Sequence, residues 1–502
     1  MTNIYKEIFK EEKFCMKKIK QLANISYDKD KKVHGILLLI VALMMIAALF
    51  NTQKALCETV VYNKDDVSGY SQYIKQFDAF EKGQLHLDIV PDEKLVALKN
   101  PYDPNERAAA NANYLWDHAF YDGKYYSYFG IAPILTVYYP FELICGSLPN
   151  DAFTCLILAI YAIIFTVLAY KEVVIRFCKK PNIYLFLLGA AAVVCASGVY
   201  LGVYCSDIYY IAVLSAQAFS MAFVFFAFRA MREGKLAKRM IFLVLSALAL
   251  VLTVLSRPTV AVMCICAFPI FIEYLINGIK EIKGGNKKAA RPLWLTVGAF
   301  AVPLLMGAAF VMWFNYARFG SPVDFGANYQ LTVNDISENK IEFKFLFSAI
   351  FSFLVNPLWY KQGFPFAQAQ NSILLPEGSR YVYFDKNVGA FAYGVTLGIF
   401  FYPCVMRLDR EEGKRDTTKD IFVLLSAVMC FVMAFLDFCM AGINMRYVYD
   451  ISYMLALVSS FILLDISARK NGKEKALFSI AAVLLFLLSI YTNICVVNTF
   501  VI

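Results

Sequence analysis

The sequence predicts an all-α membrane protein that crosses the bilayer many times. Of its 502 residues, 60% are hydrophobic, and the mean hydropathy is +0.56. The apolar residues form runs of about 20, the length that a helix needs to cross the hydrocarbon core of a bilayer. Short charged stretches separate these runs. These observations argue against a soluble protein and favour a polytopic one with about eleven transmembrane helices.

The first apolar run, 35–50, follows a basic N-terminal segment, 1–34, that contains nine lysines. No small-residue cleavage site follows the run, so we expect a retained helix rather than a signal peptide. Lysines beside membrane helices tend to remain in the cytoplasm. The N-terminal segment is therefore predicted to be cytoplasmic, either as a surface helix or as a disordered basic tail.

The distribution of Lys and Arg predicts whether residues 127–146 cross the membrane. If this stretch crossed the membrane, the basic loop 171–180 and every later basic loop would lie outside, against the usual bias. The alternative is that 127–146 stays on the outer face as an interfacial or re-entrant helix, whose regular helical length Pro133 and Pro140 limit. In that topology five inner loops hold 22 Lys and Arg in 56 residues, whereas the two large outer segments hold 14 in 148, which agrees with the usual bias. We therefore expect 127–146 not to cross.

This topology gives eleven helices with the two outer segments inserted between them. The helices are expected near 35–50, 152–170, 182–204, 208–230, 240–256, 259–276, 293–314, 388–406, 420–438, 447–465 and 476–498. The inner loops are 171–180, 232–239, 277–291, 407–419 and 466–475. The chain then divides into the N-terminal segment 1–34, the first helix 35–50, the first outer loop 51–151, a helix bundle 152–314, the second outer loop 315–387 and C-terminal helices 388–502. Residues 344–360 are predicted to form a second interfacial element, and the two outer segments together are expected to roof a cavity between the helices.

The cysteines and histidines of this sequence indicate neither a disulfide framework nor a metal site. Most of the 13 cysteines lie in apolar runs, where Cys behaves as a small hydrophobic residue. Cys57 and Cys145 are the ones clearly in the outer segments, and two thiols make no disulfide framework. The three histidines, His34, His86 and His118, lack metal-ligand spacing. The sequence predicts no metal site and no cofactor, with a divalent cation left as an option.

Four stretches carry a resemblance to a known family. They are DAFEKGQLHLD (78–88), PYDP (101–104), YLWDHAFYDGKYYSYFGIAP (114–133) and NYARFGSPVDFGANYQL (315–331). An acidic residue after the first helix, a Tyr-containing helix ending in Gly and an aromatic stretch before the next helix together resemble the GT-C membrane glycosyltransferases. The likeness is to the branch of polyprenyl-phosphate-mannose-dependent protein mannosyltransferases and the lipid A aminoarabinose transferase, and more closely to uncharacterised bacterial membrane proteins grouped with them.

The resemblance implies a sugar donor on polyprenyl phosphate and an acidic residue of the first outer loop at the reaction centre. A carboxylate would take the acceptor proton, and cations would hold the phosphate. The family motif maps onto Asp65 and Asp66, because Asp66 precedes Tyr70 and Gly83. The interval after the first helix is longer than in typical members, so Asp78 is a rival. The alternatives are a solvated turn for Asp65 and Asp66 and a polar helix position for Asp78.

The aromatic motif of the first outer segment supplies further candidate substrate-binding residues: Asp117, Asp122, Lys124, Tyr125 and Tyr126. The tyrosines could stack on sugar rings, or could form an aromatic belt at the headgroup level. Lys124 could bind phosphate, or extend its side chain toward the headgroups. Either way, we expect the motif to lie flat on the outer surface as part of the cavity wall.

Three arginines fall near outer helix ends, against the charge bias: Arg257, Arg318 and Arg446. A cation there needs an anion or an internal carboxylate, and Arg grips a phosphate with two hydrogen bonds. We expect the three guanidinium groups to converge on one cavity that receives the donor phosphate. The alternative is a set of protein ion pairs, such as Arg446 with Asp437 or Asp450. The sequence RYVYD also resembles the RY motif that opens a late helix in several GT-C members.

These features favour an enzyme, a glycosyltransferase that moves a sugar by carboxylate-assisted inverting transfer at the outer face of a bacterial plasma membrane. The expected partners are a polyprenyl-phosphate-linked sugar donor and membrane lipid, with an unknown acceptor and no nucleic acid. A transporter or flippase of a lipid-linked substrate, and a non-catalytic scaffold of envelope assembly, are the alternatives. A transporter would more often show internal repeats with matching broken helices in its two halves, and the sequence shows no such repeat. No nucleotide-phosphate motif appears either, which disfavours a cytoplasmic enzyme that uses a nucleotide sugar.

Overall fold

The structure, a computed structural model, describes residues 25–370 and 385–500. Within these ranges nine helical spans are long and apolar enough to cross a membrane, or ten if one bent pair counts as a single span. The expected class, an all-α polytopic membrane protein, is thereby confirmed, while the count of eleven is not. Most of the basic N-terminal segment, residues 1–24, lies outside the described residues.

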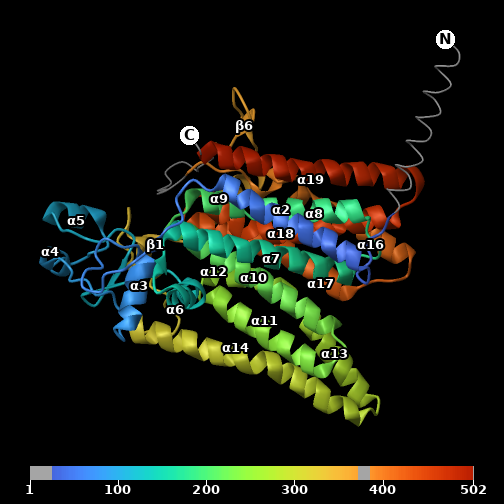
Figure 1. Cartoon of the computed structure of the whole chain (residues 1–502), viewed down its shortest axis with the longest axis horizontal. Helices are drawn as coiled ribbons and strands as arrows, with labels where there is room; N and C mark the ends of the chain where they lie inside the picture. The colour runs from blue at the N-terminus through green and yellow to red at the C-terminus, as the bar shows by residue number, and fades with distance from the viewer. Residues whose placement is uncertain (1–24, 371–384, 501–502) are drawn as a thin grey trace.

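The long helices lie side by side in one bundle, and the short elements of the first outer segment gather at one end of it (Figure 1). The helices of the nine spans are α2 (Lys32–Thr52), α7 (Asp151–Phe177), α8 (Ile183–Cys195) with α9 (Val199–Cys205), α10 (Ile208–Arg232), α11 (Leu236–Val254), η3 (Lys287–Ala289) with α14 (Ala290–Phe319), α17 (Thr417–Met440), α18 (Met445–Arg469) and α19 (Gly472–Phe500). The bent pair joins α12 (Pro258–Met263) and η2 (Cys264–Ala267) to α13 (Pro269–Lys283) at 42°.

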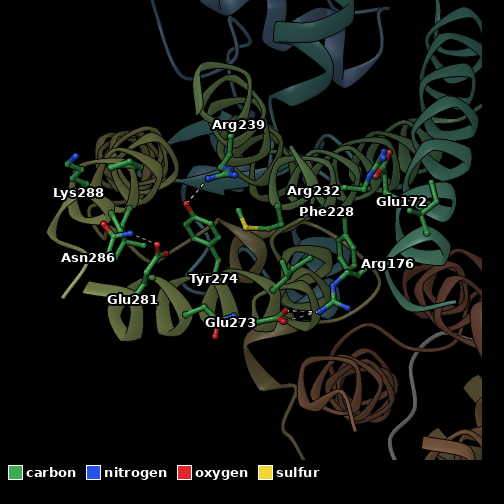
Figure 2. Close-up of a pocket in the computed structure, with 18 of the residues that line it drawn as sticks. Glu172, Arg176, Phe228, Arg232, Arg239, Glu273, Tyr274, Glu281, Asn286 and Lys288 are labelled. Atoms are coloured by element: carbon green, nitrogen blue, oxygen red, sulfur yellow. Dashed lines mark hydrogen bonds and ion pairs between the residues drawn. The ribbon is translucent and has the colours of Figure 1, made fainter. Parts of the chain in front are cut away.

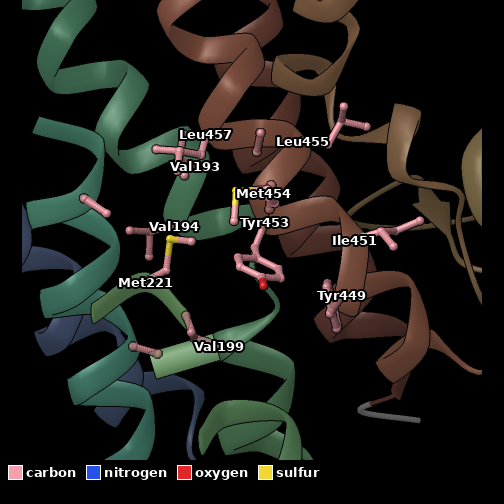
Figure 3. Close-up of a cluster of buried hydrophobic side chains, with 14 of the residues drawn as sticks. Val193, Val194, Val199, Met221, Tyr449, Ile451, Tyr453, Met454, Leu455 and Leu457 are labelled. Carbon is pink, nitrogen blue, oxygen red and sulfur yellow. The ribbon is translucent and has the colours of Figure 1, made fainter. Parts of the chain in front are cut away.

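Helix α18 is the centre of the bundle. Almost all of its residues are buried, and it packs against α7, α8, α10, α17 and α19. Figure 3 shows its Tyr453 and Met454 facing Val194 and Met221 of neighbouring helices. A helix that is buried on all sides has no separate polar face, which is why the apolar residues of α18 are spread around its whole circumference and its buried polar residues, such as Asp450 and Ser452, need partners within the bundle.

A break between α8 and α9 lets α18 approach closely. Gly198 has φ +79°, and a Cβ there would lie 2.3 Å from the ring of Tyr449. The carbonyls freed by the break are satisfied from other helices, because Ser452 Oγ donates to Ala196 O (2.6 Å) and Gln217 Nε2 donates to Ser197 O (2.6 Å). Such partners are required where water is absent.

The segment 388–406, predicted as a regular transmembrane helix, is instead built from η8 (Ala390–Ala392), a 3₁₀-helix η9 (Gly394–Phe401) and α16 (Tyr402–Glu411). A Cβ on Gly394 would lie 2.5 Å from Leu485 O, and one on Gly398 would lie 2.6 Å from Ser459 O. This close backbone approach to α19 and α18 explains the tight helix. The segment still runs the length of α18, because Asp385 N donates to Ile443 O at one end and Asp409 pairs with Arg469 at the other.

The basic loops meet at one end of the bundle, here called the basic end. Arg176 pairs with both Glu273 (2.9 Å) and Asp416 (2.8 Å), and Arg232 pairs with Glu172 (2.7 Å). These ion pairs tie loops far apart in sequence to one side, as the predicted topology requires. The opposite end, which carries the outer segments, is here called the site end.

The outer segments are built from short elements at the site end. The first segment contains β1 (Thr59–Val60), α3 (Gln72–Glu81), α4 (Glu93–Val96), α5 (Pro104–Ala110), β2 (Ala119–Tyr121), β3 (Lys124–Tyr126), a π-helix η1 (Ile134–Tyr138), α6 (Tyr139–Cys145) and β4 (Leu148–Pro149). The second contains η4 (Ala327–Tyr329), η5 (Ile336–Glu338), η6 (Phe343–Phe345), α15 (Leu346–Ile350), η7 (Phe351–Val355), β5 (Trp359–Tyr360) and β6 (Ala367–Gln368). Three two-stranded antiparallel sheets pair β1 with β4, β2 with β3 and β5 with β6.

Both segments predicted to be interfacial contain short apolar helices. The run Ile134–Cys145 and the run Phe343–Val355 each have fewer than 18 residues, too few to cross a bilayer as a helix. The expectation that 127–146 does not form a spanning helix is therefore confirmed. Helix α3 also ends as expected, because Gly83 (φ +71°) follows it and its N–H donates to Phe80 O.

Candidate functional site

A cavity of about 590 Å³ lies at the site end, within the size range of small-molecule sites. Four parts of the chain line it: the first outer segment, the start of α10, residues 327–345 of the second outer segment, and the turn from α17 into α18. Its charged side chains are Asp117, Asp335, Glu338, Lys340, Glu342 and Arg446, and its tyrosines are Tyr128, Tyr209 and Tyr447. Two of the residues predicted from sequence, Asp117 and Arg446, thus share one cavity.

Asp117 is held by contact between the two outer segments. Its N–H donates to Leu331 O (3.0 Å), and Leu331 N–H donates to His118 O (3.0 Å). From α3, Gln72 Nε2 donates to Asp117 O (2.6 Å). The backbone at Asp117 has φ +55°, a left-handed conformation that Asp tolerates better than most residues and that often marks functional sites. These bonds fix a mostly buried carboxylate at the cavity wall.

Tyr209 joins the carboxylate to the cation. Asp207 caps the start of α10 by accepting from Tyr209 N–H (2.9 Å), which places Tyr209 in the first turn. The Tyr209 hydroxyl donates to Asp117 Oδ2, and its ring lies 4.2 Å from the Arg446 guanidinium carbon. Tyr209 therefore contacts the Asp117 carboxylate through its hydroxyl and the Arg446 guanidinium through its ring face.

Arg446 lies in the first turn of α18, where Asn444 caps the helix by accepting from Arg446 N–H (3.0 Å). Its guanidinium also lies 5.0 Å from the Tyr447 ring and donates to the Tyr447 hydroxyl (3.2 Å). In the described part of the chain it forms no ion pair with a carboxylate. A cation at a helix N-terminus is disfavoured by the helix dipole, so this position is electropositive and open to an anion.

His118 lies beside Asp117 as a neutral ring. Its Nδ1 lies 2.7 Å from Trp116 O, and burial lowers the pKa of His118 to about 4. The imidazole therefore adds no positive charge beside Asp117 near neutral pH.

The other two arginines are placed differently, and the three guanidinium groups do not converge on the cavity. Arg257 forms an ion pair with buried Asp450 (2.7 Å), the alternative that the sequence left open for outer arginines. Arg318 is buried and donates to Ser127 O (3.1 Å) and Asn315 Oδ1 (3.0 Å). Of the three, Arg446 is the one that lines the cavity.

The carboxylates predicted as catalytic lie away from the cavity. Asp65 and Asp66 are exposed on a turn, where hydrogen bonds from Ser68 hold the pKa of Asp66 below its usual value and make it a weaker base. Asp78 is buried on α3 with Lys82 Nζ at 3.1 Å from its carboxylate. None of the three lines the cavity.

The aromatic motif is a β-hairpin rather than a flat surface strip. Asp122 (φ +49°) and Gly123 (φ +69°) form the two-residue turn that Asp-Gly favours, which leaves Asp122 and Lys124 exposed at the tip. Tyr125 and Tyr126 are buried within the outer segments, Tyr125 against Phe120 and Tyr126 against Phe319. These four residues therefore stay away from the cavity, and Trp116, Asp117 and Tyr128 provide the motif's contact with it.

Sequence reasoning missed Tyr209 and Tyr447 as site residues. Both lie in apolar helical runs whose local pattern is that of ordinary membrane helices, and the one available signal was a helix-capping polar residue two or three positions before each, Asp207 and Asn444. No group of three or more His, Cys, Asp or Glu side chains in residues 25–370 and 385–500 is arranged to hold a metal ion. Comparison with family models, with curated proteins and with solved structures gives no match for this chain.

Proposed function

We propose that this chain is a membrane glycosyltransferase of the GT-C type, which transfers a sugar from a polyprenyl-phosphate donor to an acceptor at the outer face of the membrane. The observation that carries the proposal is that Asp117 and Arg446 line one cavity, and both contact Tyr209, at the end of the bundle opposite the basic loops. Asp117 takes the place that the sequence assigned to Asp66, and Arg446 keeps the role assigned to it.

In this proposal Asp117 is the general base. Its Oδ2 accepts from Tyr209, so Oδ1 remains for the proton of an acceptor hydroxyl or amine. As that proton moves to Asp117, the acceptor atom forms a bond to the anomeric carbon and the bond from this carbon to the phosphate oxygen breaks. The bond's electron pair leaves with polyprenyl phosphate. Attack from the face opposite the phosphate inverts the anomeric centre.

Arg446 is the group that receives the phosphate. Its guanidinium forms no ion pair in the described part of the chain and lies at the start of α18, where helix N–H groups also favour an anion. The Tyr209 ring lies against the guanidinium, and one N–H group of the guanidinium donates to the Tyr447 hydroxyl (3.2 Å), which leaves its other N–H groups to donate to phosphate oxygens. Charge that develops on the leaving phosphate would be stabilised at that edge.

A path for the lipid tail supports a lipid-linked donor. Phe345 lines the cavity, and its neighbours Phe343 and Phe347 are 81% and 85% exposed. Phe343 also packs on Phe435 of α17, a helix with an apolar exposed face. Large exposed apolar surface next to a polar cavity marks a place where an acyl or prenyl chain can lie.

The proposal is tested by the variants Asp117→Asn and Asp66→Asn. Purified protein in liposomes is supplied with a panel of synthetic polyprenyl-phosphate monosaccharides, and envelope lipids and glycans of cells expressing each variant are compared by mass spectrometry. Asp117→Asn keeps the shape and removes the base, so transfer should fall by about 10²- to 10⁴-fold. Asp66→Asn, the matched control on an exposed turn, should stay within about twofold of wild type, since surface substitutions away from a site are nearly neutral.

Two results would reject the proposal. Equal transfer by wild type and Asp117→Asn would remove Asp117 as the base. Movement of an intact lipid-linked sugar across the liposome membrane by the wild type, with no transfer product, would replace the enzyme by a transporter.

A further inference from the structure

A second cavity, of about 880 Å³, lies at the basic end, on the far side of the bundle from Asp117 (Figure 2). The ends of α7, α10, α11, α13 and α14 surround it. Figure 2 shows Lys288 and Asn286 on one flank, Arg176 with Glu273 on the other, and Arg239 with Tyr274 between them. No part of the proposed transfer reaction uses this cavity.

The charges around the cavity are partly compensated and partly free. Arg176 and Arg232 are closed in ion pairs with glutamates. Arg239 donates to Glu233 O (2.7 Å) and to the Tyr274 hydroxyl (2.7 Å), and forms no ion pair in the described part of the chain.

Two lysines on the rim are also free of carboxylate partners. Lys29 and Lys288 are exposed, line the cavity and form no ion pair among the described residues. With Arg239, three lining cations form no ion pair among the described residues. Glu281, which accepts from Asn286, also lines the cavity, so the lining holds five Lys and Arg against three Glu and stays net positive. A set of uncompensated cations at a membrane surface attracts phosphate groups.

The floor of the cavity is apolar. Its lining includes Ile175, Phe228, Met231, Ile270 and Leu293. An apolar floor beneath a cationic rim matches a molecule with a charged head and an oily body. A soluble anion would leave this apolar surface unused, whereas the first carbons of an acyl chain would cover it.

We propose that the basic-end cavity binds an anionic phospholipid, with its phosphate against Lys29, Arg239 and Lys288 and the upper part of its acyl chains on the apolar floor. The site would bind a lipid of the leaflet at that end, whatever reaction the opposite end performs. The ligand class is a phosphodiester headgroup with net negative charge, such as phosphatidylglycerol, rather than a zwitterionic one.

The test compares two double variants of the full-length protein that lose the same charge. Lys29→Gln with Lys288→Gln removes the two free cations of the rim. Lys31→Gln with Lys287→Gln removes two exposed lysines that lie close by in sequence but do not line the cavity. Native mass spectrometry of each protein, titrated with phosphatidylglycerol or phosphatidylcholine, measures the affinity of the tightest bound lipid.

The rim variant should bind phosphatidylglycerol about 25-fold more weakly than wild type, since each lysine near a membrane phosphate contributes about fivefold. The control variant should match wild type, and phosphatidylcholine should bind all three proteins alike. Equal loss in both variants would show surface charge rather than a site, and would overturn the proposal. Displacement of the bound lipid by millimolar inorganic phosphate would overturn the lipid assignment in favour of a soluble anion.

Discussion

Tyr209 is the residue at which the site geometry makes its sharpest prediction. Its hydroxyl donates to Asp117 and its ring supports Arg446, so Tyr209→Phe removes the first contact and keeps the second. A hydrogen bond to a charged group contributes about 1.5–3 kcal/mol, which corresponds to about a 10- to 150-fold loss in the rate of transfer. A cation–π contact of about 0.5–2 kcal/mol is retained, so donor affinity should change by less than about twofold.

Tyr209→Leu is the matched variant that removes both contacts. Here the transfer rate and the affinity for the polyprenyl-phosphate donor should fall together, the latter by about two- to thirtyfold for the lost cation–π contact. Single-turnover rates in liposomes, measured against donor concentration, separate rate from affinity. If Tyr209→Phe transferred at the wild-type rate, or if it lost donor affinity as strongly as Tyr209→Leu, the shared role of Tyr209 would be refuted.

The remaining predictions concern stability and topology. His118 has a pKa of about 4 in the folded chain against an ordinary 6.5, so the unfolded chain binds the proton first as the pH falls. Acidification from pH 6.5 to 4 should therefore destabilise the outer segments by up to about 3 kcal/mol. In His118→Asn this contribution is absent, so the melting temperature should fall less over the same pH range. Arg257→Met leaves buried Asp450 without its cation and should cost about 3–5 kcal/mol, whereas Lys344→Met, in an exposed pair with Glu342, should cost less than about 1 kcal/mol in the same thermal assay. In a variant whose exposed Cys145 is replaced by Ser, a cysteine at Ser147 should react with an impermeant maleimide from outside, and one at Gly285 should not; the opposite labelling pattern would invert the topology.

Much of the fold follows from local composition. Hydropathy alone locates the nine long spans with ends that differ by at most seven residues, because a bilayer sets a minimum length for every helix that crosses it. The distribution of lysine and arginine gave the expectation that 127–146 does not cross, and the helix there is short, as expected. Hydropathy failed at 388–406, because the 3₁₀ conformation depends on how closely Gly394 and Gly398 approach the backbones of α18 and α19.

Less of the site than of the fold could be predicted from the sequence. The sequence by itself named Asp117 and Arg446 among its candidates, since a carboxylate in the first outer segment and an arginine at an outer helix end are unusual residues in an apolar chain. It ranked Asp66 first, because the spacing of a motif along the chain cannot report which way a loop turns.

Tertiary structure decided which of the candidates meet. Asp117 reaches the cavity through hydrogen bonds to Leu331 and Gln72, and Arg446 reaches it across the rings of Tyr209 and Tyr447. Tyr447 follows Arg446 directly, but the other partners lie far apart in sequence, from 45 residues for Gln72 and Asp117 to more than 200 for Tyr209 and Arg446. Whether a helix enters the membrane depends on the sum of its own apolar residues, so the local sequence determines membrane insertion. A functional site depends on the directions of single side chains from separate elements, and only the packing of those elements fixes these directions.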